Sequence, residues 1–274
     1  MPAGTFRSQA DLSNLWRLPF ARQTKRLLDM NGLLTSTVVL LALLAEPLHV
    51  SARSAEDVID RHVAALGGKD ALAMIETMRY VRTVLNTQNG VTAEQSRRIF
   101  YSQRPFFYRN EDPVSGRISI SDGREMWTGT PSTAPDSIAW QTSSRMLSSR
   151  DLDFDRLFGS FIDYASKGHT VRFEGTIELD DITVDVLQVT WKDGGEWALY
   201  FAASTGLWWG YKATPASAVM RVTDYRRVGE ILIPHRNATI EELADGGTRV
   251  HERVFSDISL NISLSDSMFA PGKH

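Results

Sequence analysis

The sequence contains no cysteine among its 274 residues. This absence excludes disulfide bonds, thiolate catalysis and cysteine-based zinc sites. It also excludes the acylated cysteine that anchors a bacterial lipoprotein to its membrane. If a chain without disulfides is exported, its fold has to be stabilised by core burial alone. Export without disulfides is compatible with the bacterial periplasm.

Signals for nucleic-acid binding and for common catalytic chemistries are also absent. The net charge is only -3, so no strong basic field attracts nucleic acid. The sequence has no G-x-S-x-G elbow, no phosphate-binding loop and no dinucleotide fingerprint. We therefore expect a protein that is not an enzyme and that has no cofactor and no nucleic-acid partner.

Metal sites are equally poorly supported. Asp151, Asp153 and Asp155 alternate as in a calcium loop, but Arg156 and Ile162 stand where such a loop needs glycine and glutamate. These acidic residues fit a helix N-terminus better, where they offset the helix dipole. The histidines lack any metal-ligand spacing: His62, His169, His235 and His251. We expect no bound metal.

The N-terminal part of the chain predicts export. An apolar run of about 14 residues, Gly32 to Ala45, follows Lys25 and Arg26 and is ended by Pro47. Val50-Ser51-Ala52 then places small residues where a signal peptidase cleaves. The run is shorter than the roughly 20 residues that span a bilayer, although an uncleaved membrane anchor stays open as an alternative. We predict a leader over residues 1–52 and one domain over 53–274.

Two helices are predicted in that domain. Ser54 caps the first helix, which runs to Leu66 and ends at Gly67-Gly68, and a shorter helical turn follows at Asp70–Ile75. The second helix is expected at about Asp151–Ala165. Its wide apolar stripe predicts a lid over a cavity and consists of Phe154, Leu157, Phe158, Phe161 and Ile162.

The remaining sequence alternates with the period of β-strands and has short turns. Strands are expected at 78–87, 91–103, 117–121, 124–129, 171–173, 182–191, 196–201, 207–211, 219–228, 231–242 and 248–260. Because no helical crossover separates the strands from 171 to 260, their pairing must be antiparallel. Thr130–Ser149, rich in Pro, Ser and Thr, is expected to be a long loop. The predicted fold class is α+β, mainly antiparallel β, with an open sheet of roughly ten strands.

Large apolar side chains gather on two of these strands. Trp197, Leu199 and Phe201 alternate on one strand, and Leu207, Trp209 and Tyr211 alternate on the next. These side chains are either ordinary core or the wall of a cavity for an apolar ligand, which a curved sheet under helices can leave open.

Two basic pairs also lie on predicted strands: Arg97-Arg98 and Arg226-Arg227. Such pairs fit a solvated face or the protection of an edge strand. The alternative is a cavity rim that holds an anionic head group. The sequence leaves both interpretations open.

Several segments together resemble the LolA/LolB superfamily of outer-membrane lipoprotein-sorting proteins. At the start, a helix runs into Ala-Leu-Gly-Gly-Lys-Asp-Ala-Leu, within Ile59–Ile75. Near the end, Asp224-Tyr225-Arg226 precedes a turn at Gly229 and Ile233-Pro234. The chain then closes on Asn261, Asp266, Phe269 and Pro271 in an N-x4-D-x2-F-x-P spacing.

This resemblance implies an unclosed antiparallel half-barrel whose concave face is covered by helices, with an apolar cavity between them. It further implies a soluble periplasmic carrier or sensor that binds lipid-like or acyl-chain ligands or lipoproteins, with a possible protein partner in the cell envelope. The long segment 130–149 departs from the well-studied carrier. The alternative function is an envelope interaction module that uses its open sheet for β-augmentation.

The export signal gives the first testable prediction. Because Val50-Ser51-Ala52 follows the apolar run, we expect cleavage after Ala52. N-terminal sequencing of the protein from a periplasmic extract should then begin Arg-Ser-Ala-Glu. A full-length product that stays in the membrane fraction would identify the segment as an anchor.

Overall fold

The computed structural model describes residues 53–104, 107–122, 124–131, 138–142, 164–192, 194–213, 218–244 and 246–271. All of these lie within one compact unit, Ser51–His274. None of the helices within these ranges is long and apolar enough to cross a bilayer.

The helices in these ranges are few. They are α1 (Ala55–Leu66), α2 (Lys69–Ala73) and a short 3-10 helix, η3 (Asp266–Phe269). The predicted cap is confirmed: the Ser54 hydroxyl accepts from the Asp57 backbone N–H, and the Asp57 carboxylate accepts from the Ser54 N–H. At the other end, Gly68 donates to the carbonyl of Val63, a bond that closes many helices.

The strands follow one another with short connections. Their bounds are β1 Thr77–Gln88, β2 Val91–Gln103, β3 Phe107–Glu111, β4 Ile118–Ser121, β5 Met126–Pro131, β6 Ile138–Thr142, β7 Thr170–Leu179, β8 Ile182–Thr190, β9 Glu196–Ala202, β10 Trp208–Lys212, β11 Met220–Val228, β12 Ile231–Glu242 and β13 Thr248–Leu260.

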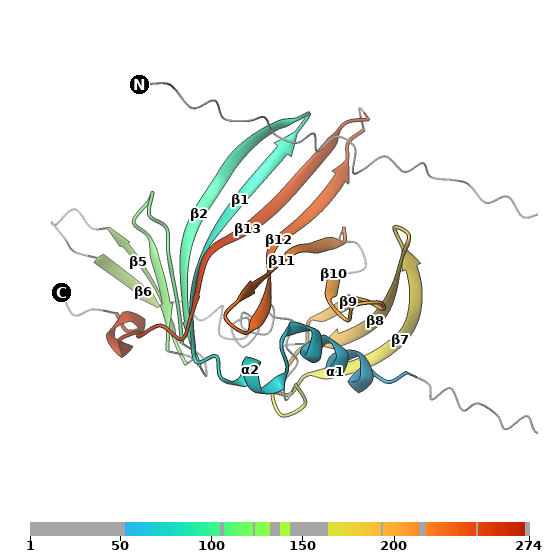
Figure 1. Ribbon diagram of the computed structural model, residues 1–274. Coiled ribbons are helices and arrows are strands. Elements are labelled where there is room, and N and C mark those ends of the chain that lie inside the picture. Colours follow the sequence, from blue (N-terminus) through green and yellow to red (C-terminus); the bar gives the residue numbers. More distant parts are fainter. Residues whose placement is uncertain are drawn as a thin grey trace, which may run out of the picture. The chain divides into compact units, whose positions relative to one another are not determined.

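All of these strands form a single open antiparallel sheet, as the short connections predicted (Figure 1). The order is β6-β5-β4-β3-β2-β1-β13-β12-β11-β10-β9-β8-β7. The sheet is therefore two meanders, β1–β6 and β7–β13, joined along β1 and β13. Every other pairing in the sheet joins two strands that follow one another in sequence.

The sheet has 13 strands rather than the roughly ten expected. Two strands were missed, β3 and β6, and β6 lies inside Thr130–Ser149, which was wrongly predicted to be loop throughout. Gly129 on β5 explains this pairing: a Cβ there would come within 2.4 Å of Ile138 and 2.9 Å of Trp140. The absent side chain lets these two bulky residues pack on β5, a tertiary effect that overrides local composition.

The main core lies between one face of the sheet and the helices. Val58, Ile59, Val63 and Leu66 of α1 are buried against apolar residues of β8, β9, β11 and β12. The core continues along the same face to Tyr80 of β1. The apolar stripe of α1 therefore fixes which face of the sheet is interior.

A buried carboxylate ties α1 to this face. Asp185 on β8 is 0% exposed and accepts hydrogen bonds from Arg53 and Arg61, each at 2.5 Å, and from Thr176 at 2.8 Å. Burial by itself raises the pKa of the Asp185 carboxyl, but the three hydrogen bonds outweigh it and hold that pKa below its ordinary value of 3.8. The ionised carboxylate therefore stabilises the docked helix.

Loss of this carboxylate should release α1. We expect Asp185→Asn to lower the free energy of unfolding by about 1–3 kcal/mol at neutral pH, since the arginines lose a charged partner. Because folding depresses the pKa, the contribution is lost as the pH falls below 3.8. Denaturant unfolding at several pH values should show that the wild type loses more stability on acidification than the variant.

Glu241→Gln is the matched control for that experiment. Glu241 pairs with Arg249 at 3.1 Å, but its side chain is 60% exposed, so its loss should change stability by less than about 0.5 kcal/mol. If Asp185→Asn were as neutral as this control, the carboxylate would not be what holds α1.

Gly206, in the turn between β9 and β10, allows the close approach of α1. Its φ is +73°, and an added Cβ would lie 2.9 Å from the Arg61 carbonyl oxygen. We expect Gly206→Ala to destabilise by at least about 2 kcal/mol. Gly229→Ala is the control: Gly229 has a φ of +61° but no neighbour within 4 Å, so only about 1 kcal/mol of backbone strain should result. Equal losses in thermal unfolding would mean that α1 does not constrain Gly206.

Candidate functional site

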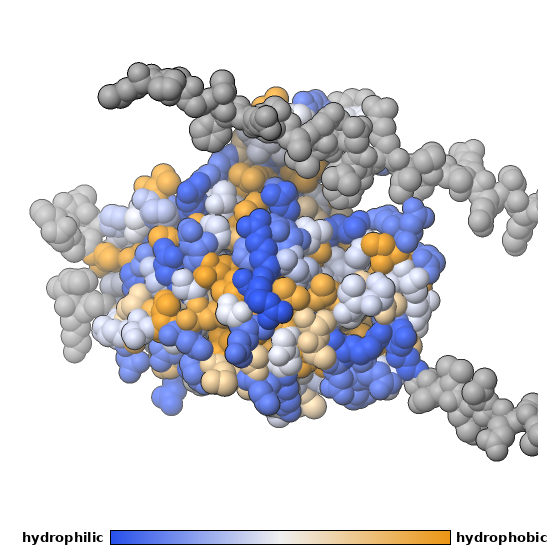
Figure 2. Space-filling view, viewed as in Figure 1, coloured by the Kyte–Doolittle hydropathy of each residue, from blue (hydrophilic) through white to orange (hydrophobic). Residues whose placement is uncertain are grey.

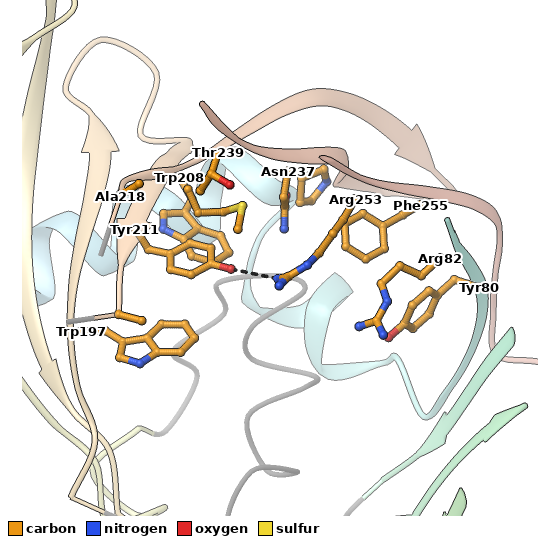
Figure 3. Close-up of a pocket in the computed structure, with 13 residues that line it drawn as sticks. Tyr80, Arg82, Trp197, Trp208, Tyr211, Ala218, Asn237, Thr239, Arg253 and Phe255 are labelled. Carbon is orange, nitrogen blue, oxygen red and sulfur yellow. Dashed lines mark hydrogen bonds between the residues drawn. The ribbon is translucent and has the colours of Figure 1, made fainter. Parts of the chain in front are cut away.

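A cavity of about 530 Å³ opens on the face of the sheet that carries the main core. Strands from both sides of the β1–β13 junction contribute to it (Figure 3). Its lining consists of Tyr80, Arg82, Trp197, Trp208, Tyr211, Ala213, Ala218, Met220, Pro234, Asn237, Thr239, Arg253 and Phe255.

One wall of the cavity is a stack of aromatic rings. Trp197 on β9 and Tyr211 on β10 lie parallel, with ring centroids 4.9 Å apart, and Trp208 stacks on Tyr211 at 5.2 Å. Tyr225 on β11 donates its hydroxyl to the carbonyl of Trp208 at 2.7 Å. Burial raises the pKa of Tyr225. The hydrogen bond therefore stays intact at physiological pH and positions β10.

The opposite wall carries positive charge. Arg82 on β1 and Arg253 on β13 point into the cavity, beside Tyr80 and Phe255 (Figure 3). Arg253 donates to the Tyr211 hydroxyl at 3.5 Å, across the cavity. The Arg82 guanidinium lies 4.5 Å from the ring centroid of Phe100, a cation–π distance. The described lining contains no aspartate or glutamate.

Three lining residues have a buried polar atom with no hydrogen-bond partner among the described residues. These atoms are Nε of Arg82, Nε1 of Trp208 and Oδ1 of Asn237. Trp208 is only 3% exposed. Buried polar groups are normally paired, because an unpaired one costs about 1–3 kcal/mol.

The six residues that the sequence predicted to form one cavity wall lie in three different parts of the structure. Trp197 and Tyr211 line the cavity. Leu199 and Phe201 are 1% and 0% exposed and lie in the core under α1, where Phe201 contacts the ring of His62 at 4.9 Å. Leu207 packs against that core. The alternation on β9 does place its three residues on one face, but two of them are covered by α1.

Trp209 does not share that face, and here the expectation from strand alternation is wrong. A register shift between Trp208 and Gly210 inserts an extra residue into β10, so Trp208 takes the inward position. Trp209 instead belongs to a small cluster with Tyr200 and Val184 on the opposite face. The Arg221 guanidinium covers its ring at 3.7 Å.

The arginines of the two basic pairs, Arg97-Arg98 and Arg226-Arg227, lie in different environments. Arg97 is 55% exposed and pairs with Glu94, and Arg226 pairs with Asp224 on the surface, as a solvated face requires. Arg98 faces the other way, into a smaller cavity of about 260 Å³ that also contains Asp112 and Arg117. Arg98 therefore fits the alternative interpretation, in which a basic residue lies at the rim of a cavity.

The predicted lid residues Phe154, Leu157, Phe158, Phe161 and Ile162 lie outside the described residues. Within the described ranges, no group of three or more histidine, aspartate or glutamate side chains is arranged to hold a metal ion.

Most residues of the cavity could not have been predicted from local sequence patterns. Tyr80, Arg82, Arg253 and Phe255 reach the cavity only because β1 pairs with β13, far apart in the chain. Trp208 reaches it only because of the irregularity in β10. The density of aromatic residues was the usable signal, and it indicated β9 and β10, which both contribute residues to the cavity lining.

Comparison with known proteins gives a likeness in fold. No protein-family model matches the sequence, and no curated protein matches it. Among solved structures, a LolA superfamily protein from Nitrosomonas europaea matches with a TM-score of 0.51 and 13% identity, over 80% of this chain and 99% of that one. A DUF1329 family protein from Desulfovibrio piger matches with a TM-score of 0.50 and 14% identity, over 78% and 96%. The chain therefore has a fold similar to that of the LolA superfamily, in agreement with the resemblance of its sequence.

Proposed function

We propose that this protein is an exported, non-enzymatic carrier or sensor that binds a lipid-like ligand, as a free amphiphile or as the acyl chains of a lipoprotein. One observation carries the proposal: the face of the sheet that binds α1 also contains a cavity with an aromatic wall. At about 530 Å³ the cavity has the size of a small-molecule site. The likeness in fold to the LolA superfamily is consistent with this role.

We further propose that the sheet curves into a half-barrel around its helices. α1 packs against both β12 and β7, which are five positions apart in the strand order. In a flat sheet these strands would be about 24 Å apart, whereas a helix of 12 residues is about 18 Å long. Curvature of the sheet would bring both strands within reach of one helix.

The face of the molecule shown in Figure 2 gives no support to an external apolar site. On this face, coloured hydrophobic residues are interspersed with hydrophilic ones. Soluble proteins that bind apolar partners externally usually present a contiguous patch. On this face, an apolar ligand is therefore better accommodated inside the cavity.

The competing function, β-augmentation at an open edge, is less well supported. β7 is an edge strand, but it has a bulge between Phe173 and Gly175 and carries an exposed Arg172–Glu174 ion pair. Bulges and charges are the features by which natural edge strands avoid pairing with other chains. We therefore favour the carrier.

Two adjacent tryptophans provide the test. Trp208 lines the cavity, and Trp209 lies on the opposite face. We expect Trp208→Ala to weaken binding of a fluorescent long-chain fatty-acid probe by about tenfold, because Tyr211 loses the ring on which it stacks and the aromatic wall is disrupted. Trp209→Ala should leave probe affinity within about twofold of the wild type. Affinity is measured by titration below the critical micelle concentration, with thermal unfolding recorded for each variant.

Equal effects of the two substitutions on binding would contradict this location for the site. If the folded wild type bound no amphiphile at all, the carrier function would be wrong and the interaction module would take its place.

A further inference from the structure

The arginines of the cavity point to a particular class of ligand. Arg82 lies directly opposite Phe255 across the β1–β13 pair, and Arg253 is two residues from Phe255 on the same face. Such diagonal neighbours are about 7–8 Å apart at the backbone, within reach of long side chains. Two side chains of this length can reach one small group placed between them.

The charge around these arginines is unbalanced. Neither Arg82 nor Arg253 forms an ion pair with a described carboxylate. Arg82 also lies directly opposite Arg98 on β2, and like charges in that arrangement destabilise a sheet. Arg98 has a carboxylate, Asp112, in the lining of its own smaller cavity, but the main cavity has none.

The hydrogen-bonding capacity of Arg82 and Arg253 also favours a negatively charged ligand. Arg82 has a buried Nε without a partner among the described residues. Arg253 makes one long bond, 3.5 Å, to the Tyr211 hydroxyl. Guanidinium groups match the geometry of carboxylate and phosphate oxygens, which accept such bonds in pairs. An oxyanion between the two arginines would accept hydrogen bonds from their terminal NH groups and offset the like charges.

The aromatic wall indicates what is attached to that oxyanion. Trp197, Tyr211 and Trp208 stack on the side of the cavity opposite Arg82 (Figure 3). One wall therefore suits an apolar chain, and the other suits a negative charge. A free inorganic anion would use only the second wall.

We propose that Arg82 and Arg253 bind the oxyanion head group, carboxylate or phosphate, of an amphiphile whose apolar chain lies along Trp197, Tyr211 and Trp208. This inference rests on the proposed carrier function and specifies the ligand of the same cavity. It also extends the cavity-rim interpretation from the predicted basic pairs to two arginines that local sequence signals did not indicate.

The test uses probes with one alkyl chain and different heads. Dodecanoate and dodecyl phosphate carry an oxyanion, dodecyl maltoside is neutral, and inorganic phosphate lacks the chain. Isothermal titration calorimetry below each critical micelle concentration should show the oxyanion amphiphiles binding at least about tenfold more tightly than the neutral one. Their affinity should also fall as salt is added, whereas that of the neutral probe should not.

Variants then identify the arginines. Arg82→Gln and Arg253→Gln should each lower dodecanoate affinity by about tenfold, and this loss should be several times larger than any loss of dodecyl maltoside affinity. Arg97→Gln is the matched control, because Arg97 is exposed and pairs with Glu94; it should change neither affinity. Arg82→Lys and Arg253→Lys keep the positive charge and should retain part of the preference for oxyanion amphiphiles over the neutral one. These variants test the proposal if a glutamine variant does not fold.

Three results would overturn the proposal in distinguishable ways. Equal binding of charged and neutral amphiphiles, unaffected by the arginine variants, would leave a carrier without a head-group site. Inorganic phosphate binding as tightly as dodecyl phosphate would identify a simple anion site. Failure of every amphiphile to bind would contradict the carrier function itself.

Discussion

The pairing of β1 with β13 is the constraint on which the rest of the structure depends. It joins two meanders that are otherwise built from neighbouring strands in sequence. Because loop-closure entropy opposes contacts between distant segments, this pairing has to be stabilised by long strands and by burial along their shared face. It brings Tyr80 and Arg82 beside Arg253 and Phe255. Without it the basic wall of the cavity would not exist.

The helix α1 completes the interior at the other end of the same face. Its position is set by three kinds of interaction: apolar burial, the ionised Asp185 and the close approach at Gly206. Apolar burial alone would allow the helix to slide, since it is non-directional. The carboxylate and the glycine supply direction, and so they determine which residues become core. Leu199 and Phe201 lie beneath α1, whereas Trp197 on the same strand faces the cavity.

Local features of the fold could be predicted from sequence, and long-range features could not. Ser54 predicted the start of α1, and the short gap between the expected strands 78–87 and 91–103 predicted the hairpin of β1 and β2. Short turns predicted the antiparallel order. The strand β6 was missed because its stability comes from packing on Gly129, and Trp209 was misplaced because a bulge reverses the alternation in β10. At the candidate site, aromatic density indicated two strands, but Arg82 and Arg253 required knowledge of the β1–β13 register.

We propose that the charged head and the apolar chain of one ligand lie in the same cavity. A crystal structure with a ligand that carries a heavy atom can locate both ends of that ligand. Soaking with dodecanoate that carries bromine at the end of its chain would mark the chain terminus by anomalous scattering. We expect carboxylate density between Arg82 and Arg253 and a bromine peak against Trp208 or Trp197. A bromine peak beside Trp209 on the opposite face, or density only along the β7 edge, would contradict it.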